Sequence, residues 1–483
     1  MKINKLLTLL SCIILAGTVG EKTFAKEVVP TPEVVTNSYD VATLEDRIAK
    51  LEYNQEHPSF EFHGYGRSGL LLNANNDLKK GKVFNKNGVG RLGNESDTYI
   101  EAELVKNFYL DNGAWAKWHI MFAKGTDDYN DWNDGVALRQ AYAEMGNLPV
   151  FSGAFKESVI WAGKRFYNRR DIHITDFYFT DYSGTGAGID NIKIGDGMLD
   201  LGVIARDYDS YDPAGLITSS SNKEDGLNVV NLLARYDIGS WEFDLGAAFS
   251  KDNENRTVAT KNYYNTYDAA DYGLQLGVFY NTPGYYWSGK GFSKLFAQVG
   301  YGLNAGDGLG SAGRGAEGNL DDALSARIGT FGVLPINEKW DLFTTVVAQH
   351  NKNSKFNYNA DLLDPQGESY SVDVDGLKST WVSVVARPVY KINENFELQF
   401  EAGYYYVTEE KDNGKNTDGN LYKLTFAPTF KLNSNDFWAR PEIRTFVTWA
   451  GWDNDYQKSF QSDLNSYSGK NGVNVGVQAE VWF

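Results

Sequence analysis

Apolar and polar residues alternate with a period of two from Phe60 to the end of this chain. In residues 60–70, FEFHGYGRSGL, the even positions include Phe60, Phe62 and Leu70, whereas the odd positions carry mostly charged and polar side chains. In residues 473–483 the odd positions are valine, alanine or phenylalanine, and most even positions are polar. A period of two gives an extended strand one apolar face and one polar face. The pattern therefore predicts an all-β fold whose strands separate two different surroundings.

A soluble β-sandwich also alternates, so further features are needed to distinguish it from a membrane barrel. Aromatic residues such as Tyr404 and Trp449 lie near strand ends on the apolar face, as interfacial girdles do. Long polar stretches alternate with short connections such as Asn393-Glu394, which is the asymmetry of extracellular loops and periplasmic turns. The chain also ends on an aromatic residue in a predicted strand. The stretches predicted to be turn-rich are 205–227, 250–270, 303–321, 351–375 and 408–420.

The composition agrees with one large antiparallel transmembrane β-barrel. Of the 483 residues, 14% are aromatic and 49 are glycine, an enrichment that suits β structure. Length alone would suggest roughly two to four domains. It equally accommodates roughly 16 to 18 strands of about ten residues each, a size at which a barrel encloses an aqueous channel. The net charge of −17 argues against a nucleic-acid partner, because no basic stripe is present to neutralise phosphates.

Residues 1–25 have the pattern of a secretory signal peptide. Lysines precede an apolar run that begins at Leu6, and small residues near Ala25 suit a cleavage site. The only cysteine, Cys12, lies inside this run, so the exported chain would contain no disulfide. After the signal, no apolar run is long enough for a transmembrane helix. The chain could then enter a bilayer only as a closed β-barrel.

Two short segments precede the alternating region. Residues 26–40 contain two prolines and no period, and are predicted to be a flexible lead-in. Residues 41–57 are predicted to form a short periplasmic coiled-coil helix, which would persist only if several chains were already held together. A single amphipathic helix packed on the protein is the alternative. The apolar a and d positions of its two heptads are Val41, Leu44, Ile48 and Leu51.

The segment from Trp161 to Asp190 is too polar for a core and too aromatic for an ordinary loop. Residues 169–178 alone contain two arginines, two aspartates and a histidine, without an apolar period. Charged groups at this density are costly to desolvate, so we expect the segment to line water. We predict that residues 58–483 form the barrel and that a loop around residues 150–190 folds inward to constrict it.

Five aromatic residues fall on the polar parity of their strands and would face the channel. A ring exposed to water can stack on the apolar face of a pyranose, while neighbouring charged groups exchange hydrogen bonds with sugar hydroxyls. Repeated weak sites of this kind suit a neutral oligosaccharide that must enter and leave. The alternative for each ring is packing against an inward-folded loop. The five rings are Tyr65, Tyr99, Phe292, Trp381 and Trp482.

Catalytic and metal-binding interpretations are weaker. The pair Asp171 and Asp176 could be compared with the two carboxylates of a glycosidase, but acidic pairs are common in an acidic chain. His63 and His173 lack metal-ligand spacing. The sequence has no phosphate-binding glycine loop, no GxSxG motif and no CxxC motif. No enzyme activity, cofactor or metal is therefore predicted.

Several motifs resemble the maltoporins, the LamB-type sugar porins of outer membranes. The resemblance extends from about Phe60 to Phe483, and the block at 161–188 is long and specific. The motifs are FHGYGRSG (62–69), RLGNESDTY (91–99), NDW (130–132), WAGKRFYNRRDIHITDFYFTDYSGTGAG (161–188) and RPVYK (387–391).

The resemblance implies a homotrimer of barrels with about 18 strands each, spanning the outer membrane many times. Each channel would carry an aromatic slide flanked by polar tracks and narrowed by the third loop. The same five rings match slide positions, and Trp132 resembles the slide tryptophan supplied by a neighbouring subunit. Tyr178 and His173 match constriction positions. The residues that match polar-track positions are Arg67, Arg91, Glu101, Arg139, Arg169, Asp171, Asp176 and Asp181.

Some features depart from this pattern. The parity of Arg139 is ambiguous, and Arg91 lies outside any strand that the alternation defines. The heptads at 41–55 are similar to the N-terminal extension of sucrose-type porins, whereas Arg169 and Tyr178 keep maltoporin-like identities and favour a narrow passage. The favoured hypothesis is facilitated diffusion of maltose and maltodextrins through the outer membrane. The alternatives are a broader porin for sucrose or β-glucosides and a secreted glycan-degrading β protein.

Overall fold

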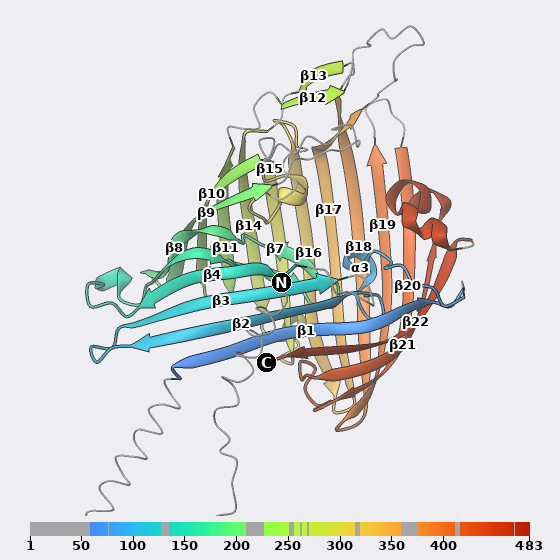
Figure 1. Cartoon of the computed structure of the whole chain (residues 1–483), viewed down its shortest axis with the longest axis horizontal. Helices are drawn as coiled ribbons and strands as arrows, with labels where there is room; N and C mark the ends of the chain where they lie inside the picture. Colours follow the sequence, from blue (N-terminus) through green and yellow to red (C-terminus); the bar gives the residue numbers. More distant parts are fainter. Residues whose placement is uncertain are drawn as a thin grey trace, which may run out of the picture. The chain divides into compact units, whose positions relative to one another are not determined.

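The structure of the chain is a computed structural model, shown in Figure 1. The predicted signal peptide (1–25), lead-in (26–40) and coiled coil (41–57) lie outside the described residues, as does Trp132. Pro58–Phe483 forms one unit. The described residues are 58–75, 77–126, 135–208, 227–250, 256–260, 263–267, 270–313, 319–358, 374–410, 416–467 and 469–483.

In the described part of the chain, 18 strands form one antiparallel sheet. Each strand of the sheet pairs with the next one along the chain, and the last strand pairs with the first. The closing contact joins Tyr65 to Trp482 and Leu72 to Val475, and it can be followed in Figure 1 where β22 lies beside β1. A closed sheet has no unpaired edge, which is the condition for a β-structure in a bilayer. The predicted all-β barrel is confirmed.

The spanning strands differ considerably in length. The barrel strands are β1 (Phe60–Asn73), β2 (Thr98–Tyr109), β3 (Trp115–Thr126), β4 (Ala137–Gly146), β5 (Val159–Arg165), β8 (Gly184–Ile194), β9 (Gly197–Tyr208), β10 (Leu227–Ile238), β11 (Trp241–Phe249), β14 (Tyr272–Thr282), β15 (Phe292–Gly302), β16 (Leu324–Asn337), β17 (Trp340–Tyr358), β18 (Val374–Asn393), β19 (Phe396–Glu410), β20 (Asn416–Lys431), β21 (Glu442–Trp452) and β22 (Asn471–Trp482). The remaining elements are α3 (Lys86–Val89), η1 (Gly153–Phe155), β6 (Arg170–Ile172), β7 (Phe177–Thr180), β12 (Arg256–Thr260), β13 (Tyr263–Tyr267), η4 (Tyr285–Trp287), η5 (Gly306–Gly308), η7 (Tyr456–Phe460) and η8 (Ser462–Ser466).

The connections at the two ends of the barrel are unequal, as predicted. At one end, β8 and β9, β10 and β11, β16 and β17, and β18 and β19 are each joined through two residues. At the other end the connections are longer and include residues 74–97, 166–183 and 453–470. In outer-membrane barrels short turns face the periplasm and long loops face outward. Among the described residues, no helix is both long enough and apolar enough to cross a membrane.

The wall of the barrel is apolar outside and polar inside. On β22, Val477 faces outward and is 39% exposed, whereas its neighbour Gln478 is 2% exposed and faces inward. Outward-facing aromatic pairs lie close to the short turns: Trp340 and Tyr390 have ring centroids 4.8 Å apart. This distribution is expected where hydrocarbon, rather than water, contacts the outer face. The parity assignment made for this strand is therefore confirmed.

The buried apolar residues lie inside the barrel, between its inner wall and the segments that fold inward. One cluster packs Ile172, Ile174 and Phe179 of the long connection after β5 against wall residues such as Phe279 and Phe343. A second cluster joins the connection after β1 to the last long connection. These contacts fix the inward-folded segments, which then decide what remains open in the channel.

Candidate functional site: the constricted channel

The segment between β5 and β8, residues 166–183, is the predicted constriction, and we call it the constriction loop. It contains the small hairpin of β6 and β7, which is paired apart from the barrel sheet. The expectation that this segment simply lines water is wrong in part. Ile172, Ile174 and Phe179 are fully or almost fully buried against the wall, because apolar residues interrupt the charged ones and give the loop an inner face of its own.

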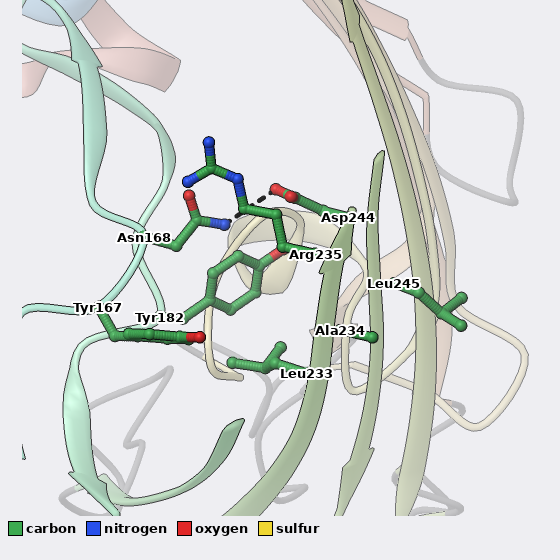
Figure 2. Close-up of a pocket in the computed structure, with 8 residues that line it drawn as sticks. All are labelled: Tyr167, Asn168, Tyr182, Leu233, Ala234, Arg235, Asp244 and Leu245. Atoms are coloured by element: carbon green, nitrogen blue, oxygen red, sulfur yellow. Dashed lines mark hydrogen bonds between the residues drawn. The ribbon is translucent and has the colours of Figure 1, made fainter. Parts of the chain in front are cut away.

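Arg170 anchors the constriction loop to β11. Its Nη2 lies 2.6 Å from Asp244 Oδ2, and its Nη1 pairs with Glu242. Beside it, Asn168 donates to Asp244 over 3.0 Å, as Figure 2 shows for the small cavity between the loop and the wall. All three charged side chains are largely buried. Charges in such surroundings are stable only while paired, so this contact holds the loop firmly.

Further contacts hold the loop at its β7 end. The carbonyl oxygen of Phe179 accepts hydrogen bonds from Gln298 (2.8 Å) and Arg327 (3.3 Å). The Phe179 ring stacks on Phe296, with centroids 4.9 Å apart. The amide of Asp181 donates to the carbonyl of Gly310 over 2.7 Å. The loop is thus fixed to the wall and to a neighbouring long connection.

Two arginines at the constriction are layered with aromatic rings. The Cζ atom of Arg169 lies 4.2 Å from the centroid of Tyr178 and 4.4 Å from that of Phe166. Arg139 lies 5.1 Å from the same Phe166 ring. Arg169 also lies 3.9 Å from Asp181. Cation–π contacts orient guanidinium planes without consuming their hydrogen-bond donors, which leaves those donors available to hydroxyl groups.

The five predicted channel rings all lie on the inward parity of the wall. Tyr65 and Tyr99 have centroids 6.1 Å apart, and Tyr65 is paired in register with Trp482. Trp381 makes ring contacts with Phe177 of the constriction loop and with Tyr405. Phe292, the fifth ring, is 37% exposed. The rings are therefore brought to one surface, although each also packs against neighbouring side chains.

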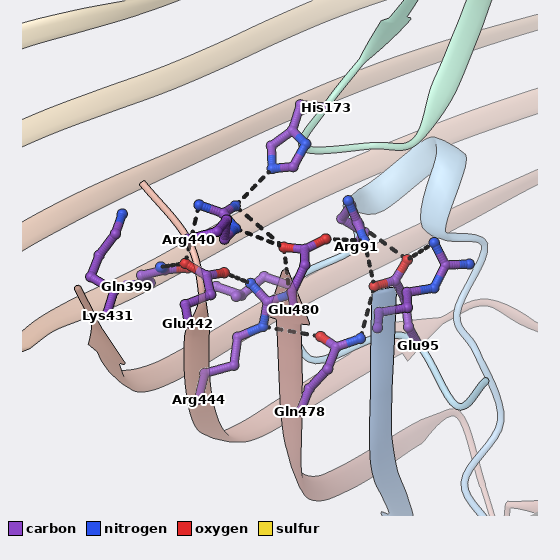
Figure 3. Close-up of polar contacts among 12 residues, drawn as sticks. Arg91, Glu95, His173, Gln399, Lys431, Arg440, Glu442, Arg444, Gln478 and Glu480 are labelled. Carbon is purple, nitrogen blue, oxygen red and sulfur yellow. Dashed lines mark hydrogen bonds and ion pairs between the residues drawn. The ribbon is translucent and has the colours of Figure 1, made fainter. Parts of the chain in front are cut away.

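A network of charged side chains surrounds Arg91 and Glu480 (Figure 3). Arg91 Nη2 donates to Glu480 (2.7 Å) and to Glu95 (3.0 Å). Tyr65 donates to the same Glu480 over 2.9 Å and accepts from Arg91 over 3.0 Å. Arg91 is only 5% exposed. It lies in the connection after β1, which explains why the alternation could not place it in a strand. Its positive charge is paired with the carboxylates of Glu95 and Glu480.

Three further polar-track residues, Arg67, Glu101 and Asp176, also have protein partners. Arg67 donates to Asp97 through two nitrogens, at 3.1 and 2.6 Å. Glu101 accepts from the Tyr99 hydroxyl at 2.5 Å. Asp176 is paired with Lys86 at 2.5 Å. These pairs set the orientation of each group before any ligand arrives.

Asp171 and His173 lie on the constriction loop, outside the spanning strands. Burial raises the pKa of Asp171, and the nearby Asp176 raises it further. Burial lowers the pKa of His173 well below its usual value, and the charge of Arg91 adds to this effect. His173 Nε2 faces Arg440 Nη2 at 3.3 Å. Because arginine only donates, His173 accepts this bond as a neutral ring.

Three side chains near the channel were missed by the sequence argument. The ring of Phe166 makes cation–π contacts with Arg139 and Arg169. Arg440 and Trp438 come from residues 432–441, the β20–β21 connection. Arg440 lies 3.9 Å from the centroid of Trp482 and covers one face of that ring. The available signal was the pair Phe437-Trp438 in a turn, where polar residues are usual. Within the described residues, no cluster of His, Cys, Asp and Glu is arranged to hold a metal ion.

Comparison with known proteins agrees with this geometry. Residues 60–483 match the LamB porin family. The chain belongs to the LamB porin family. It is 30% identical over 434 residues to the maltoporin of Vibrio cholerae serotype O1, strain El Tor Inaba N16961, covering 88% of this chain and 94% of that protein. It is also 30% identical over 458 residues to the maltoporin of Photobacterium profundum, with 88% and 93% covered.

Membership makes this LamB porin a channel of the outer membrane that crosses it many times. Membership of this family does not favour the alternative of a secreted glycan-degrading protein. Among solved structures, OpdQ of Pseudomonas aeruginosa covers 88% of this chain and 98% of its own, at 8% identity and a TM-score of 0.45. That similarity is too weak to support any inference about ligands.

Proposed function

We propose that this LamB porin transports maltose and maltodextrins by facilitated diffusion along its aromatic rings. The observation that carries the proposal is the convergence of Tyr65, Tyr99 and Trp482 on the inward face, beside the arginines of the constriction loop. Rings offer a surface for the apolar face of a pyranose, and charged groups offer hydrogen bonds to its hydroxyls. Each contact is weak, which allows a sugar to move from one to the next.

The constriction is proposed to favour linear glucans over bulkier sugars. Arg169 is held against both Tyr178 and Phe166, and the loop that carries these residues is anchored on several sides. A narrow, stiff passage admits a sugar chain end-on. A broader porin for sucrose or β-glucosides remains the second candidate, favoured by the heptads at 41–55 that resemble the extension of sucrose-type porins.

Rates of sugar entry into proteoliposomes would test this proposal. We expect swelling to be faster with maltotriose than with sucrose. We also expect Trp381→Ala and Tyr178→Ala each to weaken the block of ion current by maltodextrin by about two- to tenfold, since a lost aromatic contact of about 0.5–1.5 kcal/mol corresponds to that range. The outward-facing Trp449, which is 39% exposed, gives the control Trp449→Ala, which should leave the block unchanged.

The outcomes separate the candidates. Equal block by sucrose, β-glucosides and maltodextrin would favour the broader porin. If Trp381→Ala and Tyr178→Ala both leave the block unchanged, the rings are not the sugar path.

We further propose that the porin works as a homotrimer in outer-membrane lipid, as the resemblance to maltoporins implies. In that arrangement Trp132 of a neighbouring subunit would extend the ring path at the outer end. Chemical cross-linking of the purified porin in detergent should then give a trimer. A monomer under conditions that preserve sugar block would contradict this proposal.

A further inference from the structure

The β20–β21 connection folds back toward the channel rather than away from it. Its first part is tied to the neighbouring two-residue turn, because the Ser434 amide donates to the carbonyl of Glu394 over 2.8 Å. Its middle is held by Lys431, whose Nζ donates to the carbonyl of Phe437 over 3.1 Å. The amide of Trp438 donates to Asp436 Oδ1 over 2.8 Å. These bonds fix the backbone that leads into Trp438.

Rings from three different parts of the chain surround Trp438. His173 of the constriction loop meets it at a centroid distance of 5.2 Å and an angle of 64°. Phe343 of β17 meets it at 6.1 Å and 70°, and the adjacent Phe437 at 5.1 Å and 79°. Steep contacts of this kind are favourable for aromatic pairs and hold the plane of the ring. Even so, Trp438 stays 37% exposed.

Phe292 is the predicted slide ring that lies beside Trp438. The two centroids are 6.5 Å apart and the planes differ by 30°, so the rings are close to parallel. Phe292 is the first residue of β15, directly after the connection from β14. That connection and the β20–β21 connection are at the short-turn end of the barrel, which faces the periplasm. Trp438 therefore stands beside Phe292 at the periplasmic end of the channel.

The polar groups around Trp438 already form hydrogen bonds within the protein. Arg440 donates to the carbonyls of Phe437 (3.3 Å) and Ala439 (2.9 Å), and it covers one face of Trp482. Its side chain is 2% exposed. Few hydrogen-bonding groups therefore remain here for sugar hydroxyls. The exposed part of Trp438 can contribute by stacking on a sugar ring.

We propose that Trp438 is a further stacking site for a pyranose ring, placed next to Phe292 at the periplasmic mouth. The proposal rests on the proposed function, since it adds a site to the same sugar path. A sugar entering from the periplasm meets Trp438 together with Phe292 before it reaches the constriction. The ring would act on capture and release at that end.

Single-channel recording with maltotriose added to one side at a time tests the proposal. For Trp438→Ala we expect the association rate from the short-turn side to fall by about two- to tenfold, the range of one aromatic contact. The association rate from the long-loop side should not change. Trp438→Leu keeps much of the apolar volume without an aromatic face and should behave like Trp438→Ala. Trp438→Tyr restores a ring and should recover most of the rate.

The control is Trp340→Ala, because Trp340 lies near the same end of the barrel but contacts Tyr390 on the outer face. It should match the parent protein from both sides. Equal rates for the parent and for both Trp438→Ala and Trp438→Leu would overturn the proposal. So would an equal fall from both sides, because that result identifies a packing role alone.

The test also separates this proposal from the one on which it rests. If Trp381→Ala weakens the block and the Trp438 variants do not, only the added site is wrong. If neither set of variants changes any rate, the aromatic path itself is wrong.

Discussion

The constriction loop and the β20–β21 connection both fold into the channel, but they are anchored by different chemistry. The loop is anchored mainly through charged side chains, such as Arg170 with Asp244 and Lys86 with Asp176. The connection is anchored partly through its main-chain carbonyls, which accept from Lys431 of β20 and from its own Arg440, and partly by the pairing of Arg440 with Glu480 (3.2 Å) and Glu442 (3.4 Å). A loop held by charges shows itself in the sequence as a dense polar stretch. A turn held by its own carbonyls leaves no comparable signal.

Removing the charge anchor should have the largest effect. Arg170→Met leaves the buried Asp244 without its ion-pair partner, a change that costs about 3–5 kcal/mol, whereas Glu242 keeps Lys294 at 2.7 Å. We expect the constriction loop to detach, with a higher single-channel conductance and faster cleavage of the loop by protease. Unchanged conductance and proteolysis would show that the apolar contacts of Phe179 are sufficient to hold the loop.

Removing the carbonyl anchor should have a smaller effect. In Arg440→Met the hydrogen bonds to Phe437 and Ala439 and the ion pairs with Glu480 and Glu442 are lost, at a cost of about 1–3 kcal/mol. Glu480 keeps Arg91 and Arg444 as partners, at 2.7 and 3.3 Å, so no buried carboxylate is left alone. We expect a moderate rise in conductance, measured in the same bilayers as for Arg170→Met. A rise as large as that of Arg170→Met would remove the distinction between the two anchors.

Removing the ring that orients Arg139 and Arg169 should weaken sugar binding more than it changes ion conductance. Phe166→Leu removes the ring between Arg139 and Arg169, at about 0.5–1 kcal/mol for each contact. We expect maltodextrin block to weaken by about fivefold, with little change in conductance. Phe155→Leu is a matched control, because Phe155 is exposed in the connection between β4 and β5. A similar loss in both variants would mean that Phe166 does not position the arginines.

The smallest effect concerns pH. Because burial and Asp176 raise the pKa of Asp171, this carboxylate takes up a proton at a higher pH than an ordinary aspartate. Its negative charge is therefore lost at a higher pH than that of an ordinary aspartate, so the ion selectivity of the channel should shift toward anions as the pH falls. Reversal potentials in a salt gradient would measure this change. Asp171→Asn should show this shift toward anions already at neutral pH, and a pH dependence equal to that of the parent would exclude Asp171 as the source.

The parity of the strands was predictable, whereas exceptions to it were not. The inward placement of Tyr65, Tyr99, Phe292, Trp381 and Trp482 follows from local alternation alone. Arg139 was ambiguous because the pairing of β3 with β4 shifts register there, with Met121 opposite Gln140 and Phe122 opposite Leu138. An extra residue in one strand reverses the parity beyond it. No local pattern reveals such a bulge, since it depends on the partner strand.

The amino-acid sequence by itself determined the two faces of the wall, the closed β-barrel class and the charged loop that narrows it. These are local properties, because each residue in an extended strand has only two sides. The tertiary structure decided which groups meet. Tyr65 and Glu480 lie 415 residues apart in the chain and share a hydrogen bond, and Trp438 reaches Phe292 and His173 only after the barrel has closed. Contacts of that range depend on the register of the whole sheet, which no single segment specifies.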